Sequence, residues 1–132
     1  MKGFKSNIEK DTLKNENFRK VLYSGNHLQV VLMSLKPGED IGLETHPDTD
    51  QFFRFEGGNG KCIIDGNEYK VENGDAIVIP AGSEHNVINT DAMKEFKMYT
   101  IYGPPNHKDH LINVTKKDAE KKDVKFDGKT TE

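Results

Sequence analysis

Residues 38–58 read GEDIGLETHPDTDQFFRFEGG, and residues 73–89 read NGDAIVIPAGSEHNVIN. In both stretches, short runs rich in β-branched and aromatic residues are bounded by Gly, Pro, Asn or Asp, a pattern that predicts strands joined by turns. Side chains able to bind a metal stand at the edges of these runs, and they are Glu44, His46, Asp50, Gln51 and His85. The two stretches therefore predict a small β-barrel with a metal in its mouth.

Similar runs on both sides of these stretches extend the predicted sheet. Turn signals separate the runs, including Ser24-Gly25-Asn26 and the hairpin sequence Asp65-Gly66-Asn67. About eight short strands at nearly regular spacing are typical of an all-β sandwich or barrel. The expected strands are 18–24, 27–36, 51–56, 61–64, 68–71, 76–79, 85–89 and 95–102.

A chain of 132 residues has the size of one ordinary domain. Residues 1–17 are polar and charged and are expected to form an N-terminal arm, while residues 18–105 are expected to form the barrel. Residues 106–132 form a C-terminal segment of different composition. Thr115 and Asp118 have the spacing of a capping box, so we expect one short helix there, followed by a frayed tail.

The overall composition excludes several classes of protein. A net charge of −3 and a pI near 6.0 provide no basic surface, which argues against nucleic acid as a partner. No apolar stretch approaches the roughly 18 residues of a membrane span, and the first ten residues lack the apolar core of a signal peptide. Cys62 is the single cysteine, so no internal disulfide forms, and we expect its thiol to be buried. The default expectation is a protein of the cytoplasm.

The alternation of side chains in extended chain determines which residues share the metal site. Glu44 and His46 are two residues apart, so both side chains point to the same side. His85 begins a strand after a turn that returns the chain antiparallel, and an inward His85 would lie opposite His46 if the two strands pair. Two imidazoles and one carboxylate would then face the same space.

Gln51 and Asp50 compete for a further position in this site. An inward Gln51 carries Phe53 inward with it, whereas an inward Asp50 would bury Arg54 and Glu56. Burying those two charges would cost several kcal/mol per ion, as a rough estimate, unless they are paired. We therefore favour Gln51 in the site and Asp50 at its rim, although Asp is the better ligand for a hard metal ion and the alternative stays open.

The order and spacing of these residues resemble the two motifs of the cupin superfamily, whose fold is a double-stranded β-helix barrel of the jelly-roll type. The first motif, G-x5-H-x-H-x(3,4)-E-x6-G, is matched with Glu in place of the first His and Gln in place of the Glu. The second motif, G-x5-P-x-G-x2-H-x3-N, is matched at every fixed position. The matching residues are Gly38, Glu44, His46, Gln51 and Gly58 in the first motif and Gly74, Pro80, Gly82, His85 and Asn89 in the second.

The resemblance covers about residues 27–102 and implies one divalent metal ion held by Glu44, His46, Gln51 and His85. Two imidazoles and a carboxylate suit Fe(II), Mn, Ni or Zn, so the identity of the metal stays open. The short gap between the motifs resembles compact microbial cupins labelled as similar to mannose-6-phosphate isomerase. We therefore expect binding of, or isomerase action on, a small polar molecule such as a sugar or sugar phosphate. The alternatives are an Fe(II)-type dioxygenase and a non-catalytic module that binds a small molecule or a metal.

The strand expected at residues 27–36 is apolar on both faces. One face is expected to line the barrel interior, and the other to be covered by another layer or by a second subunit. This pattern predicts a homodimer.

The sequence also predicts the roles of three further residues. Asn89 is expected to help shape the cavity, together with the buried Phe residues. His107 and His110 follow a double proline and are expected to be solvated.

Overall fold

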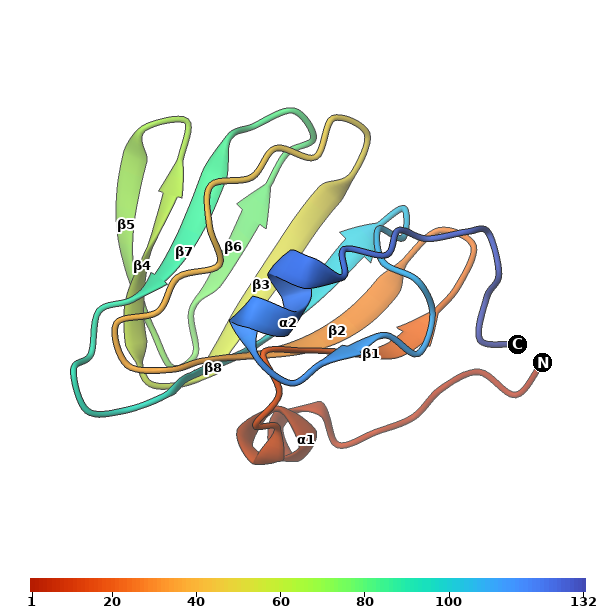
Figure 1. Ribbon diagram of the computed structural model, residues 1–132, viewed down its shortest axis with the longest axis horizontal. Helices are drawn as coiled ribbons and strands as arrows, with labels where there is room; N and C mark the ends of the chain where they lie inside the picture. The colour runs from red at the N-terminus through yellow and green to blue at the C-terminus, as the bar shows by residue number, and fades with distance from the viewer.

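The computed structural model describes residues 1–132 and contains two antiparallel β-sheets around one apolar core (Figure 1). The elements in chain order are α1 (Ile8–Lys14), β1 (Arg19–Ser24), β2 (Gln29–Leu35), β3 (Asp50–Gly57), β4 (Asn59–Ile64), β5 (Asn67–Glu72), β6 (Ala76–Ile79), β7 (His85–Asn89), β8 (Phe96–Gly103), β9 (Ile112–Asn113) and α2 (Lys116–Lys121). The larger sheet has the strand order β6-β3-β8-β2-β1-β9, and the smaller sheet has the order β5-β4-β7. Neither helix has the length and apolar character needed to cross a membrane.

The predicted all-β fold class is confirmed, including the short C-terminal helix. Each of the eight strands expected from the sequence is present, with bounds shifted by no more than two residues. The capping box of α2 is also present: the Thr115 hydroxyl accepts from the Asp118 amide at 3.1 Å, and the Asp118 carboxylate accepts from the Thr115 amide at 3.2 Å. Local signals were therefore sufficient for these elements.

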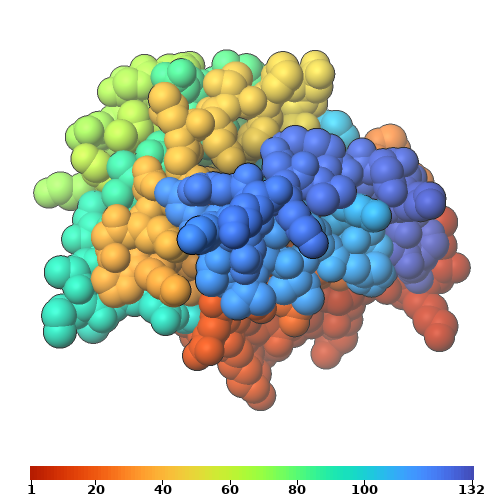
Figure 2. Space-filling view, in the orientation of Figure 1, coloured from red at the N-terminus to blue at the C-terminus, as the bar shows by residue number.

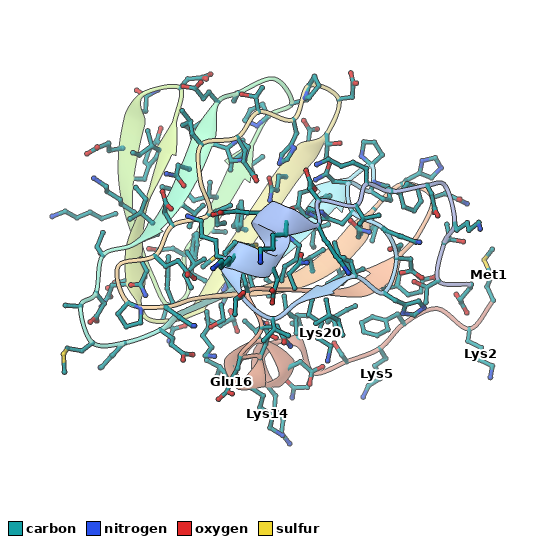
Figure 3. All side chains as sticks on the ribbon, viewed as in Figure 1. Met1, Lys2, Lys5, Lys14, Glu16 and Lys20 are labelled. Atoms are coloured by element: carbon teal, nitrogen blue, oxygen red, sulfur yellow. The ribbon has the colours of Figure 1, made fainter.

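The N-terminal segment is more ordered than an arm. Residues 8–14 form α1, whose N-cap Asn7 accepts from the Lys10 amide at 3.1 Å. The helix lies against the outer face of the larger sheet, below β2 and β8 in Figure 1, and Thr12 is fully buried there. The Lys14 side chain points away from the sheet (Figure 3). Helix α1 thus covers part of the outer face of the larger sheet, so that part needs no second subunit to cover it.

The C-terminal segment is also tied to the barrel. Its strand β9, which the sequence did not indicate, pairs with β1 and extends the larger sheet. The tail after α2 is not frayed, because the Thr131 amide donates to the Ser24 carbonyl at 2.9 Å and the Glu132 carboxylate accepts from the Tyr23 hydroxyl at 2.8 Å. The two termini consequently lie side by side (Figure 1).

Apolar side chains from both sheets form the core. Phe55 of β3 stacks on Phe96 of β8 with ring centroids 4.9 Å apart, and Val87 of β7 closes the core from the smaller sheet. Cys62 is buried here as expected, and burial raises the pKa of its thiol to about 11. The thiol is therefore an inert packing group at neutral pH.

Gly60 is a position where any side chain would disturb this core. A Cβ atom there would overlap the Phe96 ring and the backbone carbonyl oxygen of Ile88. That carbonyl belongs to β7, which pairs with β4, so it cannot move without opening the smaller sheet. We expect Gly60→Ala to lower the free energy of unfolding by roughly 1–3 kcal/mol, measured by urea denaturation.

Gly25→Ala is the matched control for this substitution. A Cβ atom at Gly25 would lie 3.5 Å from its nearest neighbour, which is ordinary contact. Its effect should stay within about 0.5 kcal/mol. Equal losses at the two glycines would contradict the steric argument.

Candidate metal centre

Two distant segments meet at one end of the barrel to form the site. Glu44 and His85 lie directly opposite each other in an antiparallel bridge, in which each amide donates to the other's carbonyl at 2.9 Å. The Gly82 amide donates to the His46 carbonyl at 2.8 Å and continues the pairing. The bridge therefore brings Glu44 and His46 beside His85.

The three side chains converge closely enough to share one ion. Their ligand atoms all lie within 4.8 Å of one another. Nε2 of His46 lies 3.3 Å from a carboxylate oxygen of Glu44, and the ring centroids of His46 and His85 are 5.3 Å apart. This is near the spacing of atoms that surround a single ion, because each ligand atom lies about 2.0–2.2 Å from a zinc-sized metal.

Two nitrogens in this cluster are buried without a hydrogen-bond partner. They are Nε2 of His46, whose contact with Glu44 lacks hydrogen-bond geometry, and Nε2 of His85. The opposite ring nitrogen of His85, Nδ1, donates to the Ser83 carbonyl at 3.0 Å, and this bond leaves the lone pair of Nε2 facing the cluster. A buried polar atom without a partner costs about 1–3 kcal/mol, so the residues present fit a metal ion.

Strand β3 places Gln51 inside the barrel and Asp50 outside. Gln51 is buried, its amide nitrogen donates to the Thr100 hydroxyl at 3.0 Å, and its carbonyl oxygen has no partner. Asp50 is exposed at the rim, where its carboxylate accepts from the Ala81 amide at 2.8 Å. The orientation favoured by the packing argument is the one observed, while metal binding by Gln51 stays a prediction.

The charge of Glu44 suits a cation site. Burial by itself would raise the pKa of the Glu44 carboxyl, but His46, Arg19 and His85 together outweigh burial and hold that pKa below its usual range. The carboxylate is therefore ionised at neutral pH. Glu44 is half-buried, so its charge lies near the surface of the protein and not deep in the core.

A cavity of about 250 Å³ opens beside Glu44, between the barrel and α2. Arg19 of β1 and His107 of the C-terminal segment line it from the barrel side. Figure 2 shows the C-terminal segment, in blue, lying across the front of the barrel over this region. The C-terminal segment thus forms one wall of the space next to the metal cluster.

The expectation that His107 is solvated was wrong. His107 is only 3% exposed, and its backbone amide and carbonyl are both bonded to the Gln29 side chain, at 3.0 and 2.6 Å. Its Nε2 lies 3.1 Å from the Tyr102 hydroxyl. Burial, followed by the nearby cations Arg19 and Lys125, lowers the pKa of His107 well below its usual value, so the ring is neutral at pH 7. His110, by contrast, is exposed as expected.

Asn89 also differs from its expected role. Its side-chain amide donates to the carbonyls of Leu35, Lys36 and Lys94 at 3.2, 3.0 and 2.9 Å, and its carbonyl accepts from the Asp91 amide at 2.9 Å. These bonds tie loops together at the end of β7 opposite to His85, so Asn89 stabilises the barrel and does not shape the cavity.

Sequence reasoning missed Arg19 and Gln29 as parts of the site. Arg19 is buried and lines the cavity, and Gln29 holds the backbone of His107. For Gln29 the only local signal was a polar residue at an inward position of a mostly apolar strand, and Arg19, in a strand that also contains Lys20 and Ser24, had no such signal. Such a residue is hydrogen-bonded to something, but its partner cannot be read from the strand alone.

Comparisons with known proteins agree with the fold and the motifs. The family model described as "Cupin domain" matches residues 31–102. The chain is 48% identical over 124 residues to the "Uncharacterized protein YrkC" of Bacillus subtilis (strain 168), covering 89% of this chain and 66% of that protein. It is 42% identical over 111 residues to the "Uncharacterized protein L612" of Acanthamoeba polyphaga mimivirus, covering 82% and 69%. The chain thus spans about two thirds of the length of these relatives.

A crystal structure of BH2720 from Bacillus halodurans is also similar, with a TM-score of 0.89 and 43% sequence identity. The match covers 92% of this chain and 96% of that chain. The family match extends over more than half of the 132 residues and includes Glu44, His46, Gln51 and His85. The chain therefore belongs to the cupin family.

Proposed function

We propose that this protein is a metal-binding cupin that holds one divalent ion with Glu44, His46, Gln51 and His85. The observation that carries the proposal is the pair of buried, unpartnered Nε2 atoms of the two histidines beside the ionised Glu44 carboxylate. The unpartnered carbonyl oxygen of Gln51 supports its inclusion as a fourth ligand. Elemental analysis of the purified protein tests the proposal, and we expect about one divalent ion per chain.

The donor set suits Fe(II), Mn, Ni or Zn and does not distinguish among them. A divalent ion held there would supply Lewis-acid polarisation of a carbonyl or enediol oxygen. The protein's own contribution is to orient the ligands: the Ser83 carbonyl fixes the tautomer of His85, and the Thr100 hydroxyl fixes the amide of Gln51. Tyr102, which is fully buried beside His46 with ring centroids 5.8 Å apart, excludes water from the inner side.

The proposed substrate is a small polar molecule, with isomerase action on a sugar or sugar phosphate as the first candidate. The second candidate is an Fe(II)-type dioxygenase, which the arrangement of two histidines and one carboxylate favours. Interconversion of aldose and ketose phosphates by the metal-loaded protein would support the first, and substrate-dependent oxygen uptake by the Fe(II) form would support the second. Saturable binding with neither reaction would indicate a non-catalytic binding module.

We further propose that the chain forms a homodimer through the outer face of the larger sheet. Four apolar residues form a continuous row across β2, β8, β3 and β6, because each is the direct cross-strand neighbour of the next: Val30, Ile101, Phe52 and Val78. All four retain some exposure, and α1 covers a different part of this face. If a second copy of the chain packed its own row against this one, both rows would be buried.

Ile101→Lys is expected to make the protein monomeric, because a lysine in the middle of this row would place a charge in the interface. Light scattering should give about twice the 14.9 kDa chain mass for the wild type and the chain mass for the variant. Leu43→Lys is the control, since Leu43 is an exposed leucine outside the row. A monomeric wild type at micromolar concentration would contradict the proposal.

A cytoplasmic location also stays a proposal. The single cysteine, Cys62, is a free thiol, which is consistent with a reducing compartment. Cell fractionation with an antibody against the chain would test it.

A further inference from the structure

Arg19 is a buried cation without an acidic partner. The residue is only 5% exposed, and its side chain points inward from β1, on the same side as Val21. One guanidinium nitrogen, Nη1, donates to the Asn113 side chain at 3.3 Å, while Nε is buried without any partner. No carboxylate lies within ion-pair distance of the guanidinium group. Burying an unpaired charge costs several kcal/mol, so this arrangement calls for a compensating anion.

The guanidinium group lies at the cavity next to the metal cluster. Arg19 and Glu44 both line the cavity of about 250 Å³, together with His107, whose Nδ1 is also buried and unpartnered. The two lysines of the cavity wall are already neutralised by neighbouring acids, Lys116 by Asp40 and Lys125 by Asp123. Arg19 is therefore the cation of this cavity that has no ion pair.

The guanidinium group is also held in place before any ligand binds. Its central carbon lies 5.3 Å from the centroid of the Phe18 ring, and the bond to Asn113 fixes it from the other side. A planar cation that is fixed in this way can present its free N–H groups to an oxyanion with little loss of entropy. The cavity is smaller than the roughly 300–1,000 Å³ of pockets that take drug-sized ligands, so the ligand is small.

Glu44 is half-buried at the same cavity, and Arg19 lies near enough to help lower the pKa of its carboxyl. Glu120 of α2 is the other acid of the cavity lining that forms no ion pair, and it is exposed. A divalent ion on Glu44 and two neutral histidines would leave a net positive charge there. The positive charges of the ion and of Arg19 would then outweigh the negative charges of Glu44 and Glu120, and this excess would favour an anionic ligand.

We propose that Arg19 binds the carboxylate or phosphate group of a small acid that occupies the cavity beside the metal cluster. This assignment rests on the proposed function, because the metal is what removes the balancing charge of Glu44. It makes Arg19 the residue that selects anionic over neutral substrates.

The test compares malonate, a small dicarboxylate, with malonamide, a neutral compound of similar shape, by calorimetric titration of the zinc-loaded protein. The wild type should bind malonate and not malonamide. Arg19→Met removes the charge but keeps most of the length, and it should bind malonate roughly 10–100-fold more weakly, as expected for the loss of a charge-assisted hydrogen bond. Inorganic phosphate titrated in parallel identifies which of the two anionic groups binds more tightly.

Lys116→Met is the matched control, since Lys116 lines the same cavity but is paired with Asp40. Its malonate affinity should stay within about twofold of the wild type. Zinc content is measured in every sample. A wild type that holds no zinc would contradict the metal proposal and not the assignment to Arg19. Undiminished malonate binding by zinc-loaded Arg19→Met, or equal binding of malonamide by the wild type, would overturn the assignment to Arg19.

A second measurement needs no variant and so does not depend on Arg19→Met folding. The Nε–H resonance of Arg19 in the zinc-loaded wild type should shift on addition of malonate and stay unchanged with malonamide. A resonance that does not move at saturating malonate would also overturn the proposal, because it would show that Arg19 only supports β9 through Asn113.

Discussion

Replacing His85 with alanine is expected to remove the bound metal and to lower the affinity for a divalent ion by more than about a hundredfold. The His85 ring is oriented by the Ser83 carbonyl at 3.0 Å, and its Nε2 is buried with no partner other than the proposed ion. Loss of a group that only orients a ligand already costs about 10–100-fold in metal affinity, so loss of the ligand itself should cost more. Elemental analysis after dialysis against metal-free buffer should show about one ion per chain in the wild type and close to none in the variant.

Two control variants separate this effect from a general loss of histidine or of acidic charge. His110→Ala should keep its metal, because the His110 side chain is 76% exposed and lies outside the cluster. Asp50→Ala should also keep its metal, whereas Gln51→Ala should bind the metal more weakly. This pair of variants decides whether Gln51 or Asp50 is the further ligand, which the sequence left open. A fully occupied His85→Ala, or a wild type that takes up no metal, would contradict the proposed centre.

Gln29→Leu is expected to give the second large effect, a loss of roughly 2–4 kcal/mol in the free energy of unfolding. The Gln29 side chain is fully buried, and it bonds to both backbone groups of His107, to the Asn106 amide at 3.2 Å and to the Ser24 hydroxyl at 2.8 Å. Leucine fills a similar volume but cannot make these bonds, so the backbone groups of His107 would be buried without partners. Urea denaturation measures the loss of stability.

Hydrogen exchange locates the effect of the same substitution. The His107 amide donates to Gln29 in the wild type at 3.0 Å and should lose its protection in Gln29→Leu. Leu28→Ala is the control, since Leu28 is the neighbouring residue and is 46% exposed. An unchanged exchange rate at His107, with a stability loss no larger than that of the control, would show that Gln29 does not hold the C-terminal segment.

Alternation along β3 predicted which face each side chain takes but not how deeply it is buried. Gln51, Phe53 and Phe55 are buried in turn, as the packing argument required. Glu56 lies on the outer face with Arg54, to which it pairs at 2.8 Å, and yet it is buried. Helix α1 packs against this end of the strand, where the Leu13 side chain comes within 3.0 Å of the position a Cβ of Gly57 would take. A local period gives the face of a residue, but the cover over that face comes from a segment far away in the chain.

Helix α1 shows a second limit of the local pattern. A helix of seven residues is too short to be stable alone in water, and the polar, charged sequence of residues 1–17 predicted only an arm. It forms because Thr12 is buried against the larger sheet, where the Lys97 side chain also donates to the Asn15 carbonyl. The sheet decides whether this segment is helical.

The sequence alone determined eight of the nine strands, the capping box and the spacing of Glu44, His46 and His85, because each depends on residues that are close in the chain or on a repeating pattern. Only the tertiary structure placed Arg19 and His107 at the cavity. Arg19 is bonded to a residue 94 positions away, and His107 to one 78 positions away. Contacts across such separations form only when the whole barrel closes, so no local pattern in the sequence records them.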